Sequence, residues 1–251
     1  MRWHYNDLQE TINQNIVRGT IGIDIGSGSG NDTYIMAMNN PLVKLTSLDI
    51  SEGVFKTKKR TSSLKNVSIV KGSTLQLPFK NDIFDFAYSY GVIHHVPNPE
   101  RGIKEIARVL KSNAPIFLYL YEDHHDDHFK KNSLRIVSIL RKITTRIHPR
   151  ILYILCFISS PVVVFVYFIS VLFLKSISKR AHEKIPFNYC SHPFSLTGDL
   201  FDRFGAPIER RFSKKEAYDL LSKNGFKNIS VDKLKTKSGL IVWGFKDNDK
   251  K

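Results

Sequence analysis

Cysteine is scarce in this sequence of 251 residues, which contains only Cys156 and Cys190. Two cysteines so placed form neither a disulfide framework nor a zinc-binding spacing. The first ten residues, MRWHYNDLQE, also lack the apolar stretch that is typical of secretory signals. We therefore expect the protein to lie in a reducing compartment, the cytoplasm. Any membrane association is then expected at the inner face of that membrane.

Acidic residues are also few: 23 Asp and Glu stand against 38 Lys and Arg, for a net charge of +15. Between His128 and Lys184 there are eleven basic residues and one acid, Glu183. Nucleic-acid-binding surfaces usually interleave basic residues with stacking aromatics. Here the basic residues flank an apolar stretch instead. This arrangement favours an anionic membrane surface as partner over nucleic acid.

The apolar stretch covers 151–174, 24 residues without a charge. As a helix it would be about 36 Å long, enough to cross a bilayer. Pro161 follows two serines and predicts a break, because proline removes a helix hydrogen bond and disfavours helix in the residue before it. A helix of about eight residues and one of about fourteen would then dip into one leaflet and return.

The preceding segment, 129–148, has the pattern of a basic amphipathic helix. One face carries Ile136, Leu140, Ile143 and Ile147, and another carries Lys131, Arg135, Lys142 and Arg146. Such a helix beside an apolar one is typical of a membrane-surface anchor. We therefore expect residues 128–184 to form a helical insertion that binds an anionic membrane surface through 129–180. The alternatives are packing on the rest of the chain, a homodimer interface, or a transmembrane span.

The first half of the chain alternates short apolar segments with helical ones. The segments 20–25, 43–50, 67–72, 83–90 and 114–121 are rich in β-branched and aromatic residues, and 32–39, 52–64 and 100–110 are helical in pattern. This alternation predicts an α/β fold with a Rossmann-like, doubly wound, mostly parallel sheet. In such sheets ligands bind outside the carboxyl ends of the strands.

A glycine-rich turn follows the first predicted strand, in DIGSGSG. Gly26, Gly28 and Gly30 permit a tight turn and close approach of a ligand to the backbone. Asp49 ends the second strand about twenty residues later, where a carboxylate can accept both hydroxyls of a ribose. These features predict an adenosine-containing ligand. The third glycine of the dinucleotide fingerprint is replaced by Asn31, which disfavours a pyrophosphate ligand.

Four motifs in this order, GIDIGSGSG, SLDIS, GSTLQLPF and FDFAYSYGVIHHVPNPERGIKEIARVLK, resemble those of class I S-adenosylmethionine-dependent methyltransferases across residues 20–121. The run GVIHHVP is similar to that of the type 11-like branch of this family. The resemblance implies a seven-stranded sheet whose last two strands, 227–234 and 239–246, form a hairpin. It also implies three regions: a cofactor-binding core over 1–127, an apolar helical insertion after the fifth strand over 128–184, and an acceptor cap with the last helix and hairpin over 185–251.

The resemblance implies S-adenosyl-L-methionine as cofactor and assigns it a set of residues. Each contact is an expectation by position: Gly26, Gly28 and Gly30 against the methionine part, Asp24 at its amino group, Asp49 on the ribose, Ile50 against the adenine, Ser73 with the adjacent Thr74 at the adenine amino group, and Tyr90 facing the transferred methyl. The family usually has an Asp where this chain has Ser73. A serine hydroxyl accepts a hydrogen bond without charge assistance, which predicts weaker cofactor binding.

The sequence indicates the catalytic group less clearly than it indicates the cofactor site. His94 or His95 would serve as a base for an oxygen acceptor, since histidine titrates near neutrality. The alternative is that this pair begins a helix and packs beneath the loop. His4 and Tyr5 either belong to a lid or are solvated. The run EDHHDDH at 122–128 contains metal-ligating side chains, but a solvated loop is favoured, and we predict no metal site.

The predicted function is methyl transfer to a small-molecule acceptor at a membrane surface, with a lipid or lipid-linked molecule such as a quinone precursor favoured. An RNA methyltransferase, or one with another soluble substrate, is the first alternative. The second is a non-catalytic adapter that keeps the fold without binding the cofactor, and only Ser73 supports it.

Overall fold

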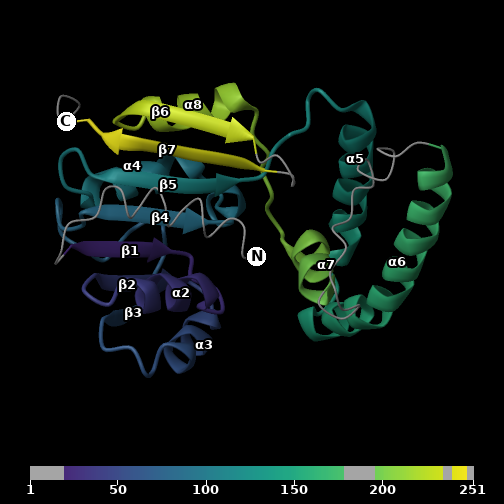
Figure 1. Cartoon of the computed structure of the whole chain (residues 1–251), viewed down its shortest axis with the longest axis horizontal. Helices are drawn as coiled ribbons and strands as arrows, with labels where there is room; N and C mark the ends of the chain where they lie inside the picture. The colour runs from purple at the N-terminus through teal and green to yellow at the C-terminus, as the bar shows by residue number, and fades with distance from the viewer. Residues whose placement is uncertain (1–19, 178–195, 234–238, 248–251) are drawn as a thin grey trace. The chain divides into compact units, whose positions relative to one another are not determined.

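The computed structural model describes residues 20–177, 196–233 and 239–247. Its first compact unit contains a seven-stranded sheet in the order β3-β2-β1-β4-β5-β7-β6 (Figure 1). The strands are β1 (Ile21–Ile25), β2 (Lys44–Asp49), β3 (Val67–Lys71), β4 (Phe86–Tyr90), β5 (Pro115–Leu120), β6 (Phe226–Lys233) and β7 (Leu240–Lys246). All pairs are parallel except those of β7, which is antiparallel to β5 and β6. The predicted mostly parallel, seven-stranded sheet is confirmed.

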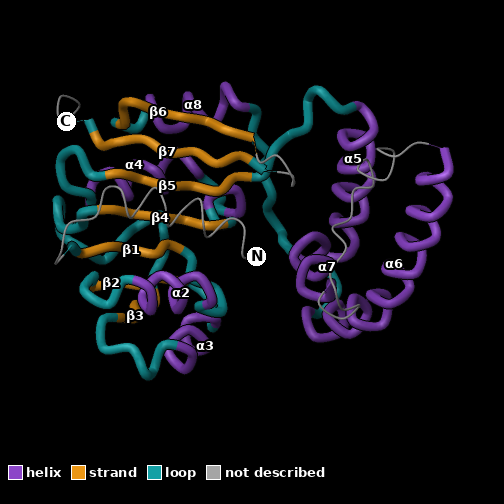
Figure 2. The backbone as a smooth tube through the Cα atoms, in the orientation of Figure 1, coloured by secondary structure: helices purple, strands orange, loops and turns teal. Residues whose placement is uncertain are grey.

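Helices cover both faces of the sheet (Figure 2). They are α2 (Asn31–Asn39), α3 (Gly53–Arg60), α4 (Pro99–Val109) and α8 (Lys214–Ser222). On one face Ile103 of α4 and Leu220 of α8 join the larger core, and on the other Met36 of α2 packs with Leu45 of β2. The two apolar layers hold the carboxyl ends of β1 to β5 along one rim, where the predicted site residues lie.

The residues between β5 and the segment before α8 form a second compact unit, Asp123–Glu209. It contains α5 (His128–Thr144), α6 (Pro149–Ile177) and α7 (Leu196–Gly205). Its small core joins Leu152 and Cys156 of α6 to Leu196 and Leu200 of α7. The unit therefore extends beyond the predicted insertion at 128–184, because α7 packs with α5 and α6.

The predicted break at Pro161 is wrong: α6 is one helix of 29 residues with the proline inside it. The reason is tertiary packing on both sides of the proline, where Cys156 and Val164 belong to the same cluster with α7. Ser160 adds two contacts, since its Oγ donates to the Cys156 carbonyl at 2.6 Å and lies 3.0 Å from Thr197 Oγ1 of α7. These contacts offset the one hydrogen bond that proline removes.

Among the described residues, α6 is the one helix whose length and composition would allow it to cross a membrane. Only 17% of its Pro149–Val166 window is buried within the structure. This low burial distinguishes α6 from the core helix of a soluble protein, which would be mostly covered by its own chain.

Candidate functional site

A tight glycine turn connects β1 to α2. Gly26 and Gly28 have φ angles of 84° and 54°, in the left-handed region that favours glycine. A Cβ on Gly26 would lie 2.1 Å from Val92 Cγ2, so the segment after β4 lies directly against this turn. A Cβ on Gly28 would meet no heavy atom of the described residues within 4 Å. The Gly28 backbone therefore faces open space, and a ligand can approach it closely.

Asp49 ends β2 beside this turn and is 7% exposed. Its Oδ2 accepts a hydrogen bond from Gly28 N at 2.7 Å. Its Oδ1 accepts from Ser51 N at 2.7 Å and from Ser51 Oγ at 2.6 Å. A carboxylate has about four acceptor positions, two on each oxygen. Oδ2 is therefore the oxygen with room for a further donor such as a ribose hydroxyl.

Asp24 lies beneath the turn, 2% exposed. Burial raises the pKa of Asp24 from 3.8 to about 7, the hydrogen bonds from Thr33 and Tyr88 oppose this rise, and the charges of Asp32 and Asp49 add to it. Thr33 Oγ1 donates to Asp24 Oδ2 at 2.5 Å. The carboxyl group is thus engaged within the chain, and its contact with a cofactor amino group stays a prediction.

The residues predicted to meet the adenine lie at the ends of β2 and β3. Ile50, which follows Asp49, is 68% exposed although apolar. Gly72 N donates to the Asp49 carbonyl at 3.0 Å, so the chain after β3 starts beside Asp49. Ser73 Oγ accepts from Leu75 N at 3.2 Å, and Thr74 is buried. The structure brings Ile50, Ser73 and Thr74 to the same rim as the glycine turn.

Five rings gather at the ends of β4 and β5: Tyr90, His94, His95, Tyr119 and Tyr121, called here the aromatic cluster. Tyr90 and Tyr119 are stacked with centroids 4.7 Å apart and planes 9° apart. Tyr121 stacks on His94 at 3.7 Å and meets His95 edge-on at 5.6 Å. Stacked and edge-on pairs are favourable geometries for aromatic side chains. The cluster lies next to the glycine turn, with His94 and Tyr119 buried and the other three rings partly exposed.

His94 and His95 differ sharply in environment, although both belong to the short 3₁₀ helix Ile93–His95. His94 is 0% exposed, and within the described part of the chain neither ring nitrogen has a hydrogen-bond partner. Its pKa is well below the ordinary value, first because of burial and then because of the positive charges of His95 and Arg211. His94 is therefore neutral at pH 7. His95 is half-buried and is the more accessible of the two.

A segment distant in sequence lies against the aromatic cluster. Arg210 N donates to the His94 carbonyl and Phe212 N to the Tyr121 carbonyl, each at 2.8 Å. The Arg211 guanidinium lies 5.2 Å from the Tyr121 ring centroid and donates to the Glu122 carbonyl at 3.1 Å. A cation over a ring face is attracted by its quadrupole. The cluster therefore carries a fixed positive charge at its border.

Three residues at this rim were not predicted from the sequence as site residues: Tyr119, Tyr121 and Arg211. The alternation of Tyr119 and Tyr121 at the end of a buried strand was a signal for the first two, because residues two apart share one face. No local signal identifies Arg211, since its position depends on pairing with strands far away in the sequence.

Of the other residues named from the sequence, some lie within the described ranges and some lie outside them. Glu122 of the EDHHDDH run is buried and forms an ion pair with Lys233 at 2.6 Å. Within the ranges that the structure describes, no three His, Cys, Asp or Glu side chains are grouped so that they could hold a metal ion. His4, Tyr5 and Cys190 lie outside those ranges.

Comparison with known proteins agrees with this geometry. Residues 23–118 match the family model described as a methyltransferase domain. The chain is 37% identical over 89 residues to 2-methyl-6-phytyl-1,4-hydroquinone methyltransferase 2 of Oryza sativa subsp. japonica, a match that covers 36% of this chain and 26% of that protein. It is 31% identical over 101 residues to the demethylmenaquinone methyltransferase of Staphylococcus aureus, covering 39% of this chain and 42% of that protein. The chain thus matches less than half the length of these relatives.

Among solved structures, an S-adenosylmethionine-dependent methyltransferase of Aquifex aeolicus superposes with a TM-score of 0.55 at 14% identity, covering 95% of this chain and 89% of that one. The fold is therefore that of the class I S-adenosylmethionine-dependent methyltransferases. Within it, residues 23–118 are the part that is similar to the methyltransferase-domain family. Membership of the branch with the G-V-x-H-H-x-P motif stays a prediction.

This fold and domain imply S-adenosyl-L-methionine as cofactor. The residues present fit that molecule, because an open backbone position at Gly28 and an acceptor oxygen of Asp49 lie side by side. Ile50 offers an exposed apolar side chain on the same rim. The individual contacts with Asp24, the three glycines, Asp49, Ile50, Ser73, Thr74 and Tyr90 remain predictions.

Proposed function

We propose that this protein transfers the methyl group of S-adenosylmethionine to an aromatic, lipid-linked acceptor at a membrane surface. The observation that carries the proposal is the arrangement at one rim of the sheet. There the turn at Gly28 and the carboxylate of Asp49 adjoin the aromatic cluster, because Val92 lies against Gly26. Cofactor and acceptor would thus be held in contact.

When bound, S-adenosylmethionine supplies an electrophilic methyl group. The acceptor atom forms a bond to the methyl carbon as the carbon–sulfur bond breaks, and the acceptor loses a proton. Alignment and exclusion of water supply much of the rate in such a displacement. Tyr90 and Tyr121 would orient a planar acceptor by stacking. His95, the accessible histidine, would accept the proton, while neutral His94 holds Tyr121 in place.

Two relatives support an amphiphilic aromatic acceptor, since their names specify a phytyl hydroquinone and demethylmenaquinone. These names describe those proteins. For this chain, they agree with the aromatic cluster and with the exposed apolar surface of the second unit. A nucleic-acid acceptor has less support, because the basic residues of 128–184 flank apolar helices.

The second unit supports membrane binding through an unusual distribution of side chains on α5. The polar residues Arg141 and Thr144 contact α7: Arg141 Nε donates to the Arg203 carbonyl at 2.9 Å and Thr144 Oγ1 to the Phe204 carbonyl at 2.6 Å. The apolar residues are exposed instead, at 61% for Ile136. The other exposed apolar residues of α5 are Ile139, Leu140 and Ile143. Exposed apolar patches of this kind mark membrane or protein contacts.

The helix α6 is also exposed along much of its length. Among the α6 side chains that the structure describes, eleven large apolar ones are exposed: Ile151, Tyr153, Ile154, Leu155, Phe157, Ile158, Val162, Phe165, Val166, Phe168 and Ile169. Basic residues at 135, 142, 146 and 150 are exposed nearby in the sequence and suit anionic headgroups. Because β5 and β7 pair in one sheet, a single crossing by α6 would place paired strands on opposite sides of a bilayer. The proposal is therefore that α6 is part of a surface-bound anchor and does not span the membrane.

The test uses S-adenosylmethionine with a labelled methyl group, the purified protein and a membrane extract of the source cells. Label should appear in the organic phase and be lost with Asp49→Ala. Asp232→Ala, which removes an exposed carboxylate on β6, is the matched control and should retain activity. Label only in the aqueous phase would contradict a lipid-linked acceptor and leave a soluble substrate or RNA. Failure of the wild-type protein to bind S-adenosylhomocysteine would overturn the methyltransferase and favour the adapter.

A further inference from the structure

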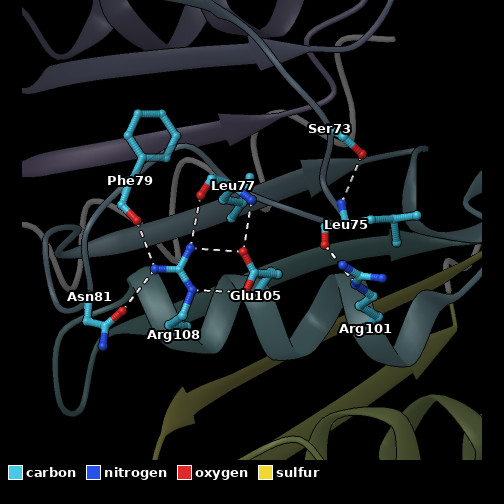
Figure 3. A network of polar contacts seen from close by, with 8 residues as sticks. All are labelled: Ser73, Leu75, Leu77, Phe79, Asn81, Arg101, Glu105 and Arg108. Carbon is cyan, nitrogen blue, oxygen red and sulfur yellow. Dashed lines mark hydrogen bonds and ion pairs between the residues drawn. The ribbon is translucent and has the colours of Figure 1, made fainter.

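The chain between β3 and β4 has an unusual attachment to the rest of the protein. Residues 73–81 form no long strand or helix, yet their backbone groups are held by side chains of α4 (Figure 3). The side chains are Arg101, Glu105 and Arg108, called here the α4 clamp. They are spaced four and three residues apart, so they lie on one face of the helix.

The α4 clamp binds alternate peptide groups of this segment. Arg101 Nε donates to the Leu75 carbonyl at 3.0 Å. Leu77 N donates to Glu105 Oε2 at 2.8 Å, and Arg108 Nη2 donates to the Leu77 carbonyl at 2.9 Å. Glu105 and Arg108 thus provide the Leu77 N–H and carbonyl groups with the hydrogen bonds that a neighbouring strand would otherwise provide.

Arg108 is the centre of the clamp. Besides Leu77 it donates to the Phe79 carbonyl at 2.8 Å and to Asn81 Oδ1 at 2.9 Å. It also forms two hydrogen bonds of 2.9 Å with Glu105, and the Glu105 pKa is lowered chiefly by the hydrogen bond from Arg108. A planar guanidinium can make all of these contacts at once, whereas an ammonium group cannot.

The segment held in this way starts at the ligand-binding rim. Gly72 N donates to the carbonyl of Asp49, the residue placed to accept ribose hydroxyls, so Ser73 and Thr74 lie next to that ribose position. Thr74 also packs against α4, where a Cβ on Gly102 would be 3.4 Å from Thr74 Cγ2. A base attached to the ribose would meet the backbone and hydroxyls of 73–74. The α4 clamp holds the residues that directly follow them, starting at the Leu75 carbonyl.

We propose that Arg108, through Glu105 and the backbone of 75–79, is a positioning residue that determines how the protein recognises the purine base of its cofactor. Rigid placement matters here because Ser73 offers only a neutral hydroxyl. A neutral hydrogen bond is weaker than a charge-assisted one and depends on good geometry. The inference rests on the proposed function, since it concerns how the same cofactor is held.

The test compares binding of S-adenosylhomocysteine with binding of S-inosylhomocysteine, which has an oxo group in place of the adenine amino group. Both affinities are measured by calorimetry for the wild-type chain and for Arg108→Ala. We expect Arg108→Ala to bind the adenine compound about three- to tenfold more weakly, as for the loss of one hydrogen bond. Binding of the inosine compound should change less, so the preference for adenine falls.

Two further variants separate positioning from general stability. Lys104→Ala alters an exposed residue of the same helix outside the clamp and should leave the preference unchanged. Arg108→Lys keeps the charge but not the forked geometry and should fall between the wild type and Arg108→Ala. Hydrogen exchange should increase at 75–79 in Arg108→Ala and stay unchanged in β4 and β5.

The outcomes are distinct. If the wild-type chain binds neither compound, the proposed function fails. If the wild type binds and Arg108→Ala keeps the same preference for adenine, the inference is overturned while the proposed function stands. An equal loss for both compounds, with increased exchange across the whole sheet, would also overturn it, because Arg108 would then serve only stability.

Discussion

The chemistry of the candidate site depends on individual residues at the carboxyl end of the sheet. Asp24 shows how strongly burial changes the pKa of such a residue. Its carboxyl group is almost fully covered and is bound by the Thr33 hydroxyl. A charged carboxylate loses favourable hydration in this position, so the protonated form is favoured in the folded state. Burial raises the pKa of Asp24 to about 7.

This pKa has a consequence for stability. The stabilising effect of the protonated form is complete below the unfolded pKa of 3.8 and is lost as pH rises through about 7. At about 1.4 kcal/mol for each pKa unit, the loss is about 4 kcal/mol at most. The asparagine of Asp24→Asn stays neutral at every pH. The free energy of unfolding of this variant should therefore increase relative to that of the wild type between pH 4 and pH 8.

Urea denaturation at pH 4, 6 and 8 measures this difference. Asp232→Asn, at an exposed position of the edge strand β6, is the control and should show little pH-dependent gain. If the difference between Asp24→Asn and the wild type is the same at all three pH values, then Asp24 has an ordinary pKa and is already ionised in the folded state at pH 6.

Among the elements, α5 is joined by a buried ion pair to the segment that follows α7. Arg141 Nη2 lies 2.7 Å from Glu209 Oε2, and the two side chains are only 10% and 5% exposed. Removing one partner of such a pair leaves an uncompensated buried charge, which typically costs about 3–5 kcal/mol. Arg141→Ala should therefore destabilise the second unit strongly, and Arg141→Met with Glu209→Met should destabilise it less.

Hydrogen exchange can locate this effect. Amides of α7 should exchange faster in Arg141→Ala, while those of β5 remain protected. Exposed Arg135→Ala, on the same helix, is the matched control and should leave α7 unchanged. Slow exchange of α7 in Arg141→Ala would show that the pair contributes nothing to the packing of α5 with α7.

For the molecule as a whole, the positive charge and the exposed apolar surface occur in the same unit. We expect the full chain to sediment with vesicles containing phosphatidylglycerol and less with pure phosphatidylcholine, and binding should weaken at high salt. Replacing both Ile136 and Ile143 with Ser should weaken binding by about tenfold or more, because burial of each side chain contributes about 1.5–3 kcal/mol.

A matched control replaces Met38 and Leu42 with Ser, two residues of the first unit that are exposed to a similar degree. This variant should bind vesicles as the wild type does. Equal binding by the isoleucine variant would contradict the membrane assignment of α5. In that case a change from dimer to monomer in the isoleucine variant would identify the exposed face as a contact between copies of the chain.

Much of the fold was predictable because its signals are local. The seven strands and α2, α3 and α4 occur within a few residues of their predicted ranges, except that α3 ends earlier. Ser213 and Glu216 form a capping box at the start of α8. Alternation of apolar residues and capping depend on near neighbours in the chain, so the sequence alone contains them.

The candidate site was predictable only in part. The glycine turn and Asp49 are found next to each other, as expected for residues that follow neighbouring strands. The opposite environments of His94 and His95 were not predictable, because they depend on Tyr121 and on the distant segment around Arg211. Adjacent residues have the same local pattern, and only long-range packing decides which one is covered.

The sequence by itself determined the order of the elements, the glycine turn after β1 and the excess of basic and apolar residues in 128–184. Tertiary structure decided that α6 continues through Pro161, because α7 packs on both sides of the proline. It also decided that α5 presents Arg141 to α7 and leaves Ile136 exposed. Helical periodicity defines faces, but which face is covered depends on the partner that the fold supplies.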